Sequence, residues 1–341
     1  MTSTTKLALR ATAIAALTMM SVTAFAAVDI DANIELDSKY ENNSRGASQA
    51  GRIELNASKK AGSKYFIAGR ATYLSHPDGT ANVDDLWAQM GNETADIKLG
   101  RFEAANLFQT PGDVIVEYAG FSPYQANLLR GRQGATSNGN APFHAAATVQ
   151  LGGGLSFELS GVSTKGSGFA TGIRPVLSYA NGPLHLAAGV EVLKFNGTPL
   201  TTSPSTSCTL NTSTNQCTFD TITTSATPSV SRTGYGVTAD YNFGPVTLTA
   251  NYAQVKNLAN IRANTFGLMA SIGNLTLAGV YGKGSATNAD DKVTTFWAAY
   301  AIPFFDIPNA KITPAVSMSK GSGTNTAKDA TGLAVRVNYA F

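Results

Sequence analysis

Residues 28–37 read VDIDANIELD, and hydrophobic and polar side chains alternate through the whole stretch. Val, Ile, Ala and Leu occupy one phase, and the other phase holds only Asp, Asn and Glu. Successive side chains of a β-strand point to opposite faces, so this stretch predicts a strand with one apolar and one polar face. The fold class depends on how often this pattern returns.

The alternation returns as far as the C-terminus and predicts sixteen strands. No segment after residue 26 has the roughly 18 consecutive apolar residues of a membrane-spanning helix. Short turns, such as 152–154 and 273–274, alternate with longer polar stretches, such as 41–50 and 319–331. This alternation is typical of an up-and-down barrel with both termini on the periplasmic side. The strands are expected at about residues 28–36, 52–57, 65–73, 86–90, 97–99, 145–151, 155–161, 173–179, 184–192, 235–241, 246–252, 266–272, 275–281, 293–302, 312–318 and 333–341.

The composition favours a membrane barrel over a soluble β-sandwich. Only 14% of the 341 residues are charged, against roughly 25% in a typical soluble protein. A sandwich would need charge on its outer face, whereas here the polar phase carries most of the strand charges. Lipid around the apolar face and water in the lumen explain both phases. We therefore expect an all-β, antiparallel transmembrane barrel of sixteen strands in a bacterial outer membrane.

Residues 1–26 predict a cleaved secretory signal peptide. Lys6 and Arg10 precede an uncharged stretch that ends in Ala24-Phe25-Ala26, a small-x-small site. Without those two cations, 23 basic residues remain against 22 acidic ones in residues 27–341. This near-neutral charge gives no reason to expect a nucleic-acid partner.

Export to an oxidising compartment also bears on the two cysteines. Cys208 and Cys217 lie close together in a Thr/Ser-rich segment, so we expect one disulfide that closes a small external loop at about residues 195–232. The segment offers too few ligands for a metal site, and no cofactor is expected.

Several short motifs resemble those of the Gram-negative trimeric porins. Residues 84–92, DDLWAQMGN, and 98–102, KLGRF, are similar to the fourth and fifth strands of proteobacterial porins. The last strand ends in VRVNYAF at 335–341, and Phe341 resembles the signal that the outer-membrane assembly machinery reads. The resemblance implies a homotrimer in outer-membrane lipid that passes small hydrophilic solutes and ions by passive diffusion.

The resemblance also implies a constriction. The third external loop, at about residues 103–142, would fold into the barrel, although it lacks the short acidic Pro-Glu-Phe-type stretch of the best-known members. Opposed loop acids and wall cations would create a transverse field across the pore, with weak ion selectivity. The candidate residues are Glu103, Asp113, Glu117, Arg130 and Arg132 in the loop, and Arg52, Arg70 and Lys98 on the wall.

Three other functions compete with a general porin. A sugar-selective porin would use aromatic faces, for which the candidates are Phe66, Trp87, Tyr118, Phe121 and Tyr124. A barrel enzyme is less favoured, because His144 and His185 fall in the lumen phase and His76 in a loop, with no Ser-His-acid arrangement. A GxGxxA match at 234–239 precedes no helix and is not a dinucleotide site. A structural or adhesive barrel is suggested only by the Thr/Ser-rich loop at 195–232.

Overall fold

The computed structural model describes residues 28–42, 46–124, 130, 143–163, 170–195, 201–211, 216–224, 229–256, 261–285, 288–323 and 329–341. At 170, 195, 201–211, 216–224 and 230 only the backbone is described, and the expected signal peptide lies outside these residues. No described helix is long and apolar enough to cross a membrane. The strands are β1 (Asp29–Glu41), β2 (Gly46–Ala61), β3 (Tyr65–Ser75), β4 (Ala81–Asn92), β5 (Ala95–Arg101), β6 (Phe143–Gly152), β7 (Leu155–Ser163), β8 (Ala170–Asn181), β9 (Leu184–Phe195), β10 (Thr201–Asn211), β11 (Gln216–Thr224), β12 (Val230–Asn242), β13 (Val246–Lys256), β14 (Arg262–Ile272), β15 (Leu275–Lys283), β16 (Lys292–Tyr300), β17 (Ile302–Pro303), β18 (Ala310–Ser322) and β19 (Asp329–Ala340).

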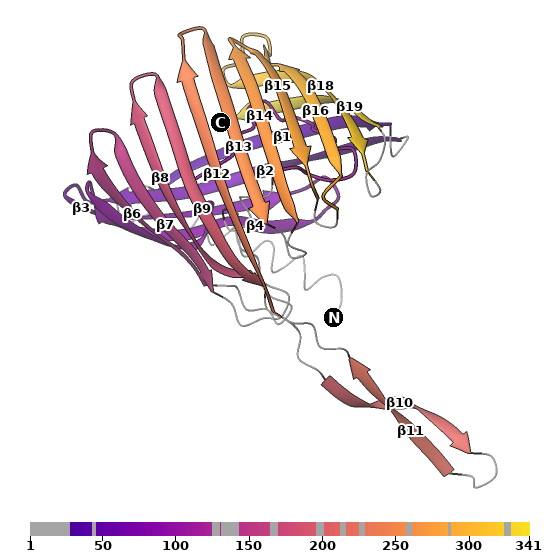
Figure 1. The fold of residues 1–341 in the computed structure, drawn as a ribbon. Helices are drawn as coiled ribbons and strands as arrows, with labels where there is room; N and C mark the ends of the chain where they lie inside the picture. The colour runs from indigo at the N-terminus through magenta and orange to yellow at the C-terminus, as the bar shows by residue number, and fades with distance from the viewer. Residues whose placement is uncertain are drawn as a thin grey trace, which may run out of the picture.

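Sixteen long strands form one closed antiparallel barrel (Figure 1). Neighbours in the sequence pair with one another, β9 pairs with β12, β16 pairs with β18, and β19 closes the ring on β1. The two-residue strand β17 adds a short pairing beside β18. Each of the sixteen predicted strands lies within or overlaps one of these long strands, so the predicted fold class is confirmed.

The hairpin of β10 and β11 was not predicted. It forms a separate two-stranded sheet within the segment that we expected to be a loop. The segment is rich in threonine, which favours strands, but it lacks the apolar alternation that marks the barrel strands. In the register of this hairpin, Cys208 is opposite Phe219 and Cys217 is opposite Leu210. The side chains of both cysteines lie outside the described residues, so the disulfide stays a prediction.

The connections alternate in length around the barrel, as the sequence predicts. The turn between β14 and β15 has two residues, 273–274, and Gly273 adopts a φ of 54°, which a tight hairpin turn requires. Ala32 donates its N–H to the Phe341 carbonyl at 2.8 Å, and Phe341 returns one at 2.9 Å. The start of β1 and the end of β19 therefore lie at the rim that carries the short turns. In such barrels this is the periplasmic rim.

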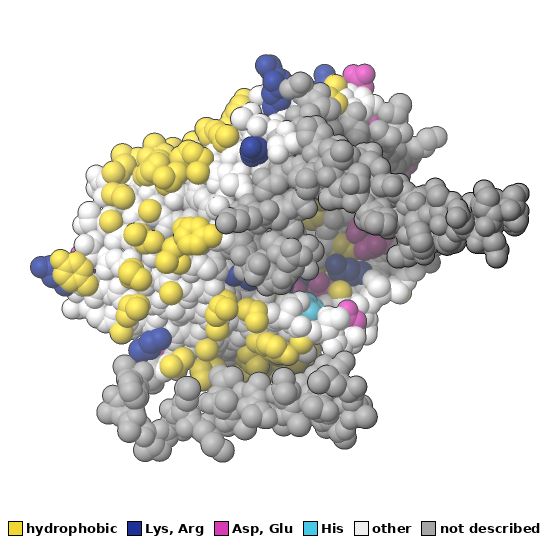
Figure 2. Space-filling model, turned by 90° about the horizontal axis from the view of Figure 1, so that it is seen from below, with side chains coloured by type: hydrophobic (Ala, Val, Ile, Leu, Met, Phe, Trp, Pro, Cys, Tyr) yellow, Lys and Arg dark blue, Asp and Glu magenta, His cyan; other side chains and the backbone are white. Residues whose placement is uncertain are grey.

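The barrel has its apolar face outside. Leu268 and Phe296 expose 65% and 61% of their surface, whereas inward-facing Thr295 and Ser317 expose none. Figure 2 shows hydrophobic side chains spread over the outer surface, with acidic, basic and histidine side chains visible in the central opening. Closure pairs the backbone groups of the barrel strands, as a bilayer demands.

Candidate pore constriction

The segment after β5 folds back into the barrel. We call residues 102–142 the inner loop; residues 102–124 and 130 of it are described. Leu107 and Ala119 have no exposed surface, and Phe102 exposes 2%. The loop packs against small and apolar side chains of the inner wall: Phe102 against Ala146, Leu107 against Val176 and Ala187, Phe108 against Met269, Ala278 and Trp297, Ile115 against Ala299, Ala315 and Ala334, and Ala119 against Val293 and Ala330.

Glycines on the inner wall let the loop approach closely. A Cβ at Gly236 would come within 2.8 Å of the Leu107 Cβ, and one at Gly282 within 2.5 Å of the Pro123 Cβ. Any larger residue at these positions would push the loop away from the wall. Lumen-facing glycines thus mark the path of the loop.

Wall side chains also satisfy the loop backbone, which has no regular secondary structure of its own. Ser317 and Ser319 accept the N–H groups of Glu117 and Ala119 through their hydroxyl oxygens, both at 2.9 Å. Asn251 accepts the Gln109 N–H at 3.0 Å and donates to the Gln109 carbonyl at 2.8 Å. The loop is therefore bound along much of its length, not only at its ends.

A group of charged side chains, of which Arg174 and Glu191 are fully buried and Glu158 and Arg232 are half-buried, holds the start of the loop. We call Glu158, Arg174, Glu191 and Arg232 the buried clamp; they come from β7, β8, β9 and β12. Arg174 Nη1 donates to the Ala105 carbonyl at 2.6 Å, while Glu158 accepts the N–H of the same residue at 2.8 Å. The Arg174 Nε lies 3.6 Å from Glu191, and neither side chain has exposed surface. One residue of the loop is thus fixed through both its backbone groups.

The wall formed by β19 and β1–β4 carries the second set of charges. We call Glu35, Asp37, Arg52, Glu54, Arg70, Asp85 and Arg336 the arginine wall. In the described residues, the hydrophobic clusters of the loop include no residue of β1, β2 or β3. The hydrophobic contacts of the described part of the loop therefore leave this wall uncovered.

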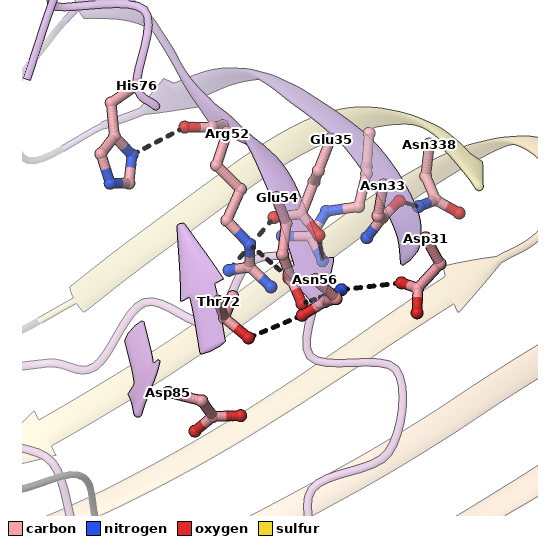
Figure 3. A network of polar contacts seen from close by, with 12 residues as sticks. Asp31, Asn33, Glu35, Arg52, Glu54, Asn56, Thr72, His76, Asp85 and Asn338 are labelled. Carbon is pink, nitrogen blue, oxygen red and sulfur yellow. Dashed lines mark hydrogen bonds and ion pairs between the residues drawn. The ribbon is translucent and has the colours of Figure 1, made fainter. Parts of the chain in front are cut away.

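Each arginine of the wall contacts two carboxylates of the same wall. Figure 3 shows Arg52 with its two partners, Glu35 and Glu54. Glu54 lies between Arg52 and Arg70, at 3.4 Å from each. Arg52 also lies 3.9 Å from Glu35, and Arg70 lies 3.5 Å from Asp85. In the whole arginine wall, the carboxylates of Glu35, Asp37, Glu54 and Asp85 thus surround the three guanidinium groups.

Arg336 completes this arrangement from β19. Its Nε and Nη2 donate to the two Asp37 oxygens at 2.7 and 2.8 Å, and its Nη1 lies 3.1 Å from Glu35. Sequence reasoning missed Arg336, although it stands in the polar phase of the quoted C-terminal strand. It also missed Arg174, which the same phase argument would have found on β8.

The loop acids of the sequence analysis have other partners. Glu103 pairs with Arg130 of the same loop at 2.8 Å, and Asp113 accepts a hydrogen bond from Thr110 at 3.0 Å. Burial raises the pKa of Asp113, while the charge of Arg336 opposes that shift. Arg132 lies outside the described residues, and Lys98 lies 4.7 Å above the Trp87 ring.

Glu117 lies close to Glu41 at the end of β1. Burial raises the pKa of Glu117 to about 7, and a hydrogen bond with the Glu41 side chain and its charge add to the shift. The charge of Lys39 lowers the pKa against these effects. Glu117 therefore holds its proton more tightly than an ordinary glutamate does.

The aromatic candidates for solute stacking largely contact protein groups. Tyr118 donates to the Tyr124 hydroxyl at 2.7 Å, and Tyr124 stacks on Phe108 at 4.8 Å between ring centres. Burial raises the pKa of both tyrosines. Phe121 packs beside Ala119, and the Lys60 ammonium lies 4.3 Å from the Phe66 ring centre. Of the five rings, those of Tyr118 and Tyr124 contact each other, at 5.8 Å between ring centres.

Among the described residues, no group of three or more His, Cys, Asp and Glu side chains is placed to hold a metal ion.

Comparison with known proteins agrees with this architecture. The model of the Gram-negative porin family matches residues 11–303. Similar solved structures include an anion-selective porin from Comamonas acidovorans (TM-score 0.62, 14% identity, covering 92% of this chain and 99% of the other) and the trimer form of OmpT from Vibrio cholerae (0.61, 13%, 92% and 99%). OmpF of Salmonella typhi, in a complex with daunomycin, is similar too (0.59, 14%, 92% and 97%).

No curated protein sequence matches the chain. The structural likenesses at these identities concern the fold, whereas the family match covers most of the sequence. The closed sixteen-stranded barrel agrees with that match. The chain therefore belongs to the Gram-negative porin family and is an outer-membrane porin channel.

Proposed function

We propose that small hydrophilic solutes and ions diffuse passively through the space between the inner loop and the arginine wall. The observation that carries this proposal is the burial of the loop inside the barrel, with Leu107 and Ala119 fully covered. A pore narrowed on one side by a bound loop excludes large solutes, while its charged lining keeps water and polar solutes inside. Liposomes containing the protein should therefore swell in small sugars and amino acids, and swelling should slow steeply with solute size.

We further propose a homotrimer that has no catalytic activity. The trimer form of a structural neighbour supports the assembly. Each histidine of the chain engages a group other than a serine hydroxyl. His76 contacts the Gly51 carbonyl at 3.0 Å, His144 stacks on Phe102, and His185 contacts Asp240 at 3.1 Å. A hydrolytic triad would need a serine at such a histidine.

Removing the guanidinium groups of Arg52 and Arg70 should raise cation preference. The double variant Arg52→Ala, Arg70→Ala leaves Glu35, Glu54 and Asp85 without these partners, so the wall becomes more negative. We expect the cation-to-anion permeability ratio to rise roughly twofold to fivefold, because lumen charges at short range act through water and salt. Reversal potentials under a salt gradient measure this ratio.

The matched control is Lys64→Ala, which removes an exposed cation from the turn between β2 and β3. Its reversal potential should equal that of the wild type. If the double arginine variant keeps the wild-type reversal potential, Arg52 and Arg70 do not set the ion selectivity of the constriction.

The contact of Glu117 with Glu41 predicts a pH dependence. An acid whose pKa is raised in the docked state holds its proton more tightly there than in a free loop, so docking weakens as the pH rises. The docking of the loop should weaken as the pH rises from the ordinary glutamate pKa, near 4.5, to about 7, and should then stay constant. Current fluctuations of single channels should increase over that range, because the loop contacts β1 less firmly.

Glu117→Gln removes the titration and should make these fluctuations independent of pH. Glu103→Gln serves as the control, since Glu103 pairs with Arg130 at another part of the loop. A pH dependence that survives Glu117→Gln would assign the effect to another group.

A further inference from the structure

A recess of about 490 Å³, lined by polar side chains together with Ala32, Ala340 and Phe341, lies on the periplasmic side of the arginine wall. It is formed by β1, β2, β19 and the turn before β18. In the register, Asp31 is opposite Asn56 and Asn33 is opposite Glu54, whereas Glu35 and Arg52 form the next pair on the same face. Glu54 belongs to both the recess and the arginine wall, so the two adjoin, and Asp31 lies four residues, about 13 Å, from Glu35 along β1. The polar side chains that line it are Asp31, Asn33, Glu54, Asn56, Asn309 and Asn338.

Asp31 supplies a negative charge that no described cation balances. Its carboxylate accepts a hydrogen bond from the Asn56 amide at 2.8 Å (Figure 3), and it forms no ion pair within the described residues. Arg70 donates to the Oδ1 of Asn56 at 2.7 Å. The amide of Asn56 therefore separates the guanidinium from the Asp31 carboxylate, and the charge of Asp31 acts within the recess.

The asparagines add neutral donors and acceptors beside this charge. Asn338 donates to the Oδ1 of Asn33 at 2.6 Å, a bond that does not use the amide nitrogen of Asn33 or the amide oxygen of Asn338. Asn309 brings a further side-chain amide from the turn before β18. Hydroxyl groups, which both donate and accept, suit such amides, and an ammonium group suits an uncompensated carboxylate.

We propose that this recess is a binding subsite for small hydroxylated amine cations, such as amino sugars, on their passage through the pore. The inference rests on the channel function proposed above and adds a class of solute to it. The Asp31 carboxylate binds the ammonium group, and the amides of Asn33, Asn309 and Asn338 bind the hydroxyls. The volume of the recess fits one such molecule.

The test records single-channel current in planar bilayers with glucosamine, glucose or glucuronate added at about pH 6, where an amine of this kind is protonated. These probes share a ring and differ in charge. Glucosamine should interrupt the wild-type current more strongly than glucose, and glucuronate least. Asp31→Asn keeps the shape of the side chain and should weaken glucosamine association about twofold to fivefold, the range for an exposed ion pair.

Asp96→Asn is the matched control, because the Asp96 carboxylate also accepts from an amide, that of Gln89 at 2.8 Å, but lies outside the recess. It should leave glucosamine association unchanged. A conducting channel in which Asp31→Asn has no effect, or in which both variants lose association equally, overturns the subsite and leaves the channel function intact. A folded barrel that carries no current overturns the channel function and the subsite together.

Discussion

Deleting residues 112–124 should roughly double the single-channel conductance, since conductance follows the open cross-section of a water-filled pore. This part of the inner loop packs across the inner faces of β14, β15, β16, β18 and β19. The barrel strands pair only with one another, so the deletion leaves the closed sheet in place. Planar-bilayer recording measures the effect, and larger sugars should then enter liposomes that contain the variant.

The control for this deletion is removal of residues 201–224. Within this stretch, β10 and β11 form a separate sheet and pair with no barrel strand, so the conductance should stay at the wild-type value. If deleting 112–124 leaves the conductance unchanged while the barrel folds, the loop does not limit the pore.

Arg174→Met should lower barrel stability strongly and loosen the start of the inner loop. The change leaves the fully buried Glu191 without Arg174 as its partner, and breaking a buried ion pair costs about 3–5 kcal/mol. It also removes the hydrogen bond to the Ala105 carbonyl. Thermal unfolding in detergent should shift downward, and single-channel records should become noisier.

The double variant Arg174→Met, Glu191→Leu separates the two effects. It removes both buried charges, so most of the lost stability should return, because hydrophobic replacements of a buried pair are often neutral. The noise in the single-channel records should remain, because the Ala105 carbonyl still lacks the hydrogen bond from Arg174. Quiet records for both variants would show that the buried clamp stabilises the barrel without holding the loop.

Sequence alternation predicted the barrel well because a membrane strand must sort its side chains by face. In β1, Ile34 and Leu36 lie exposed on the outer face and Glu35 and Asp37 face the lumen, as the phase requires. The hairpin of β10 and β11 carries no such sorting, so the same argument could not find it.

The partners of the charged residues could not be predicted in the same way. Phase places Arg52 and Arg70 in the lumen, but it does not show that Glu54 lies 3.4 Å from both. That depends on the stagger between neighbouring strands, which one sequence does not specify. For the same reason, Arg336 was not linked to Asp37, which is 299 positions away in the chain.

The path of the inner loop depends on contacts between distant segments. Wall glycines such as Gly236 and Gly282 leave room for Leu107 and Pro123, but a glycine in a strand has several explanations when only the sequence is known. The long segment after β5 indicated a functional loop by its length alone.

Single-channel recording of the purified wild-type protein in a planar bilayer tests whether this barrel is an open channel. We expect stable open steps that close in groups of three, with current proportional to voltage and unaffected by maltose. Block by a neutral sugar such as maltose, at rising concentration, would instead support a sugar-selective porin. A folded barrel that inserts into the bilayer and carries no current would show that this barrel is not an open channel.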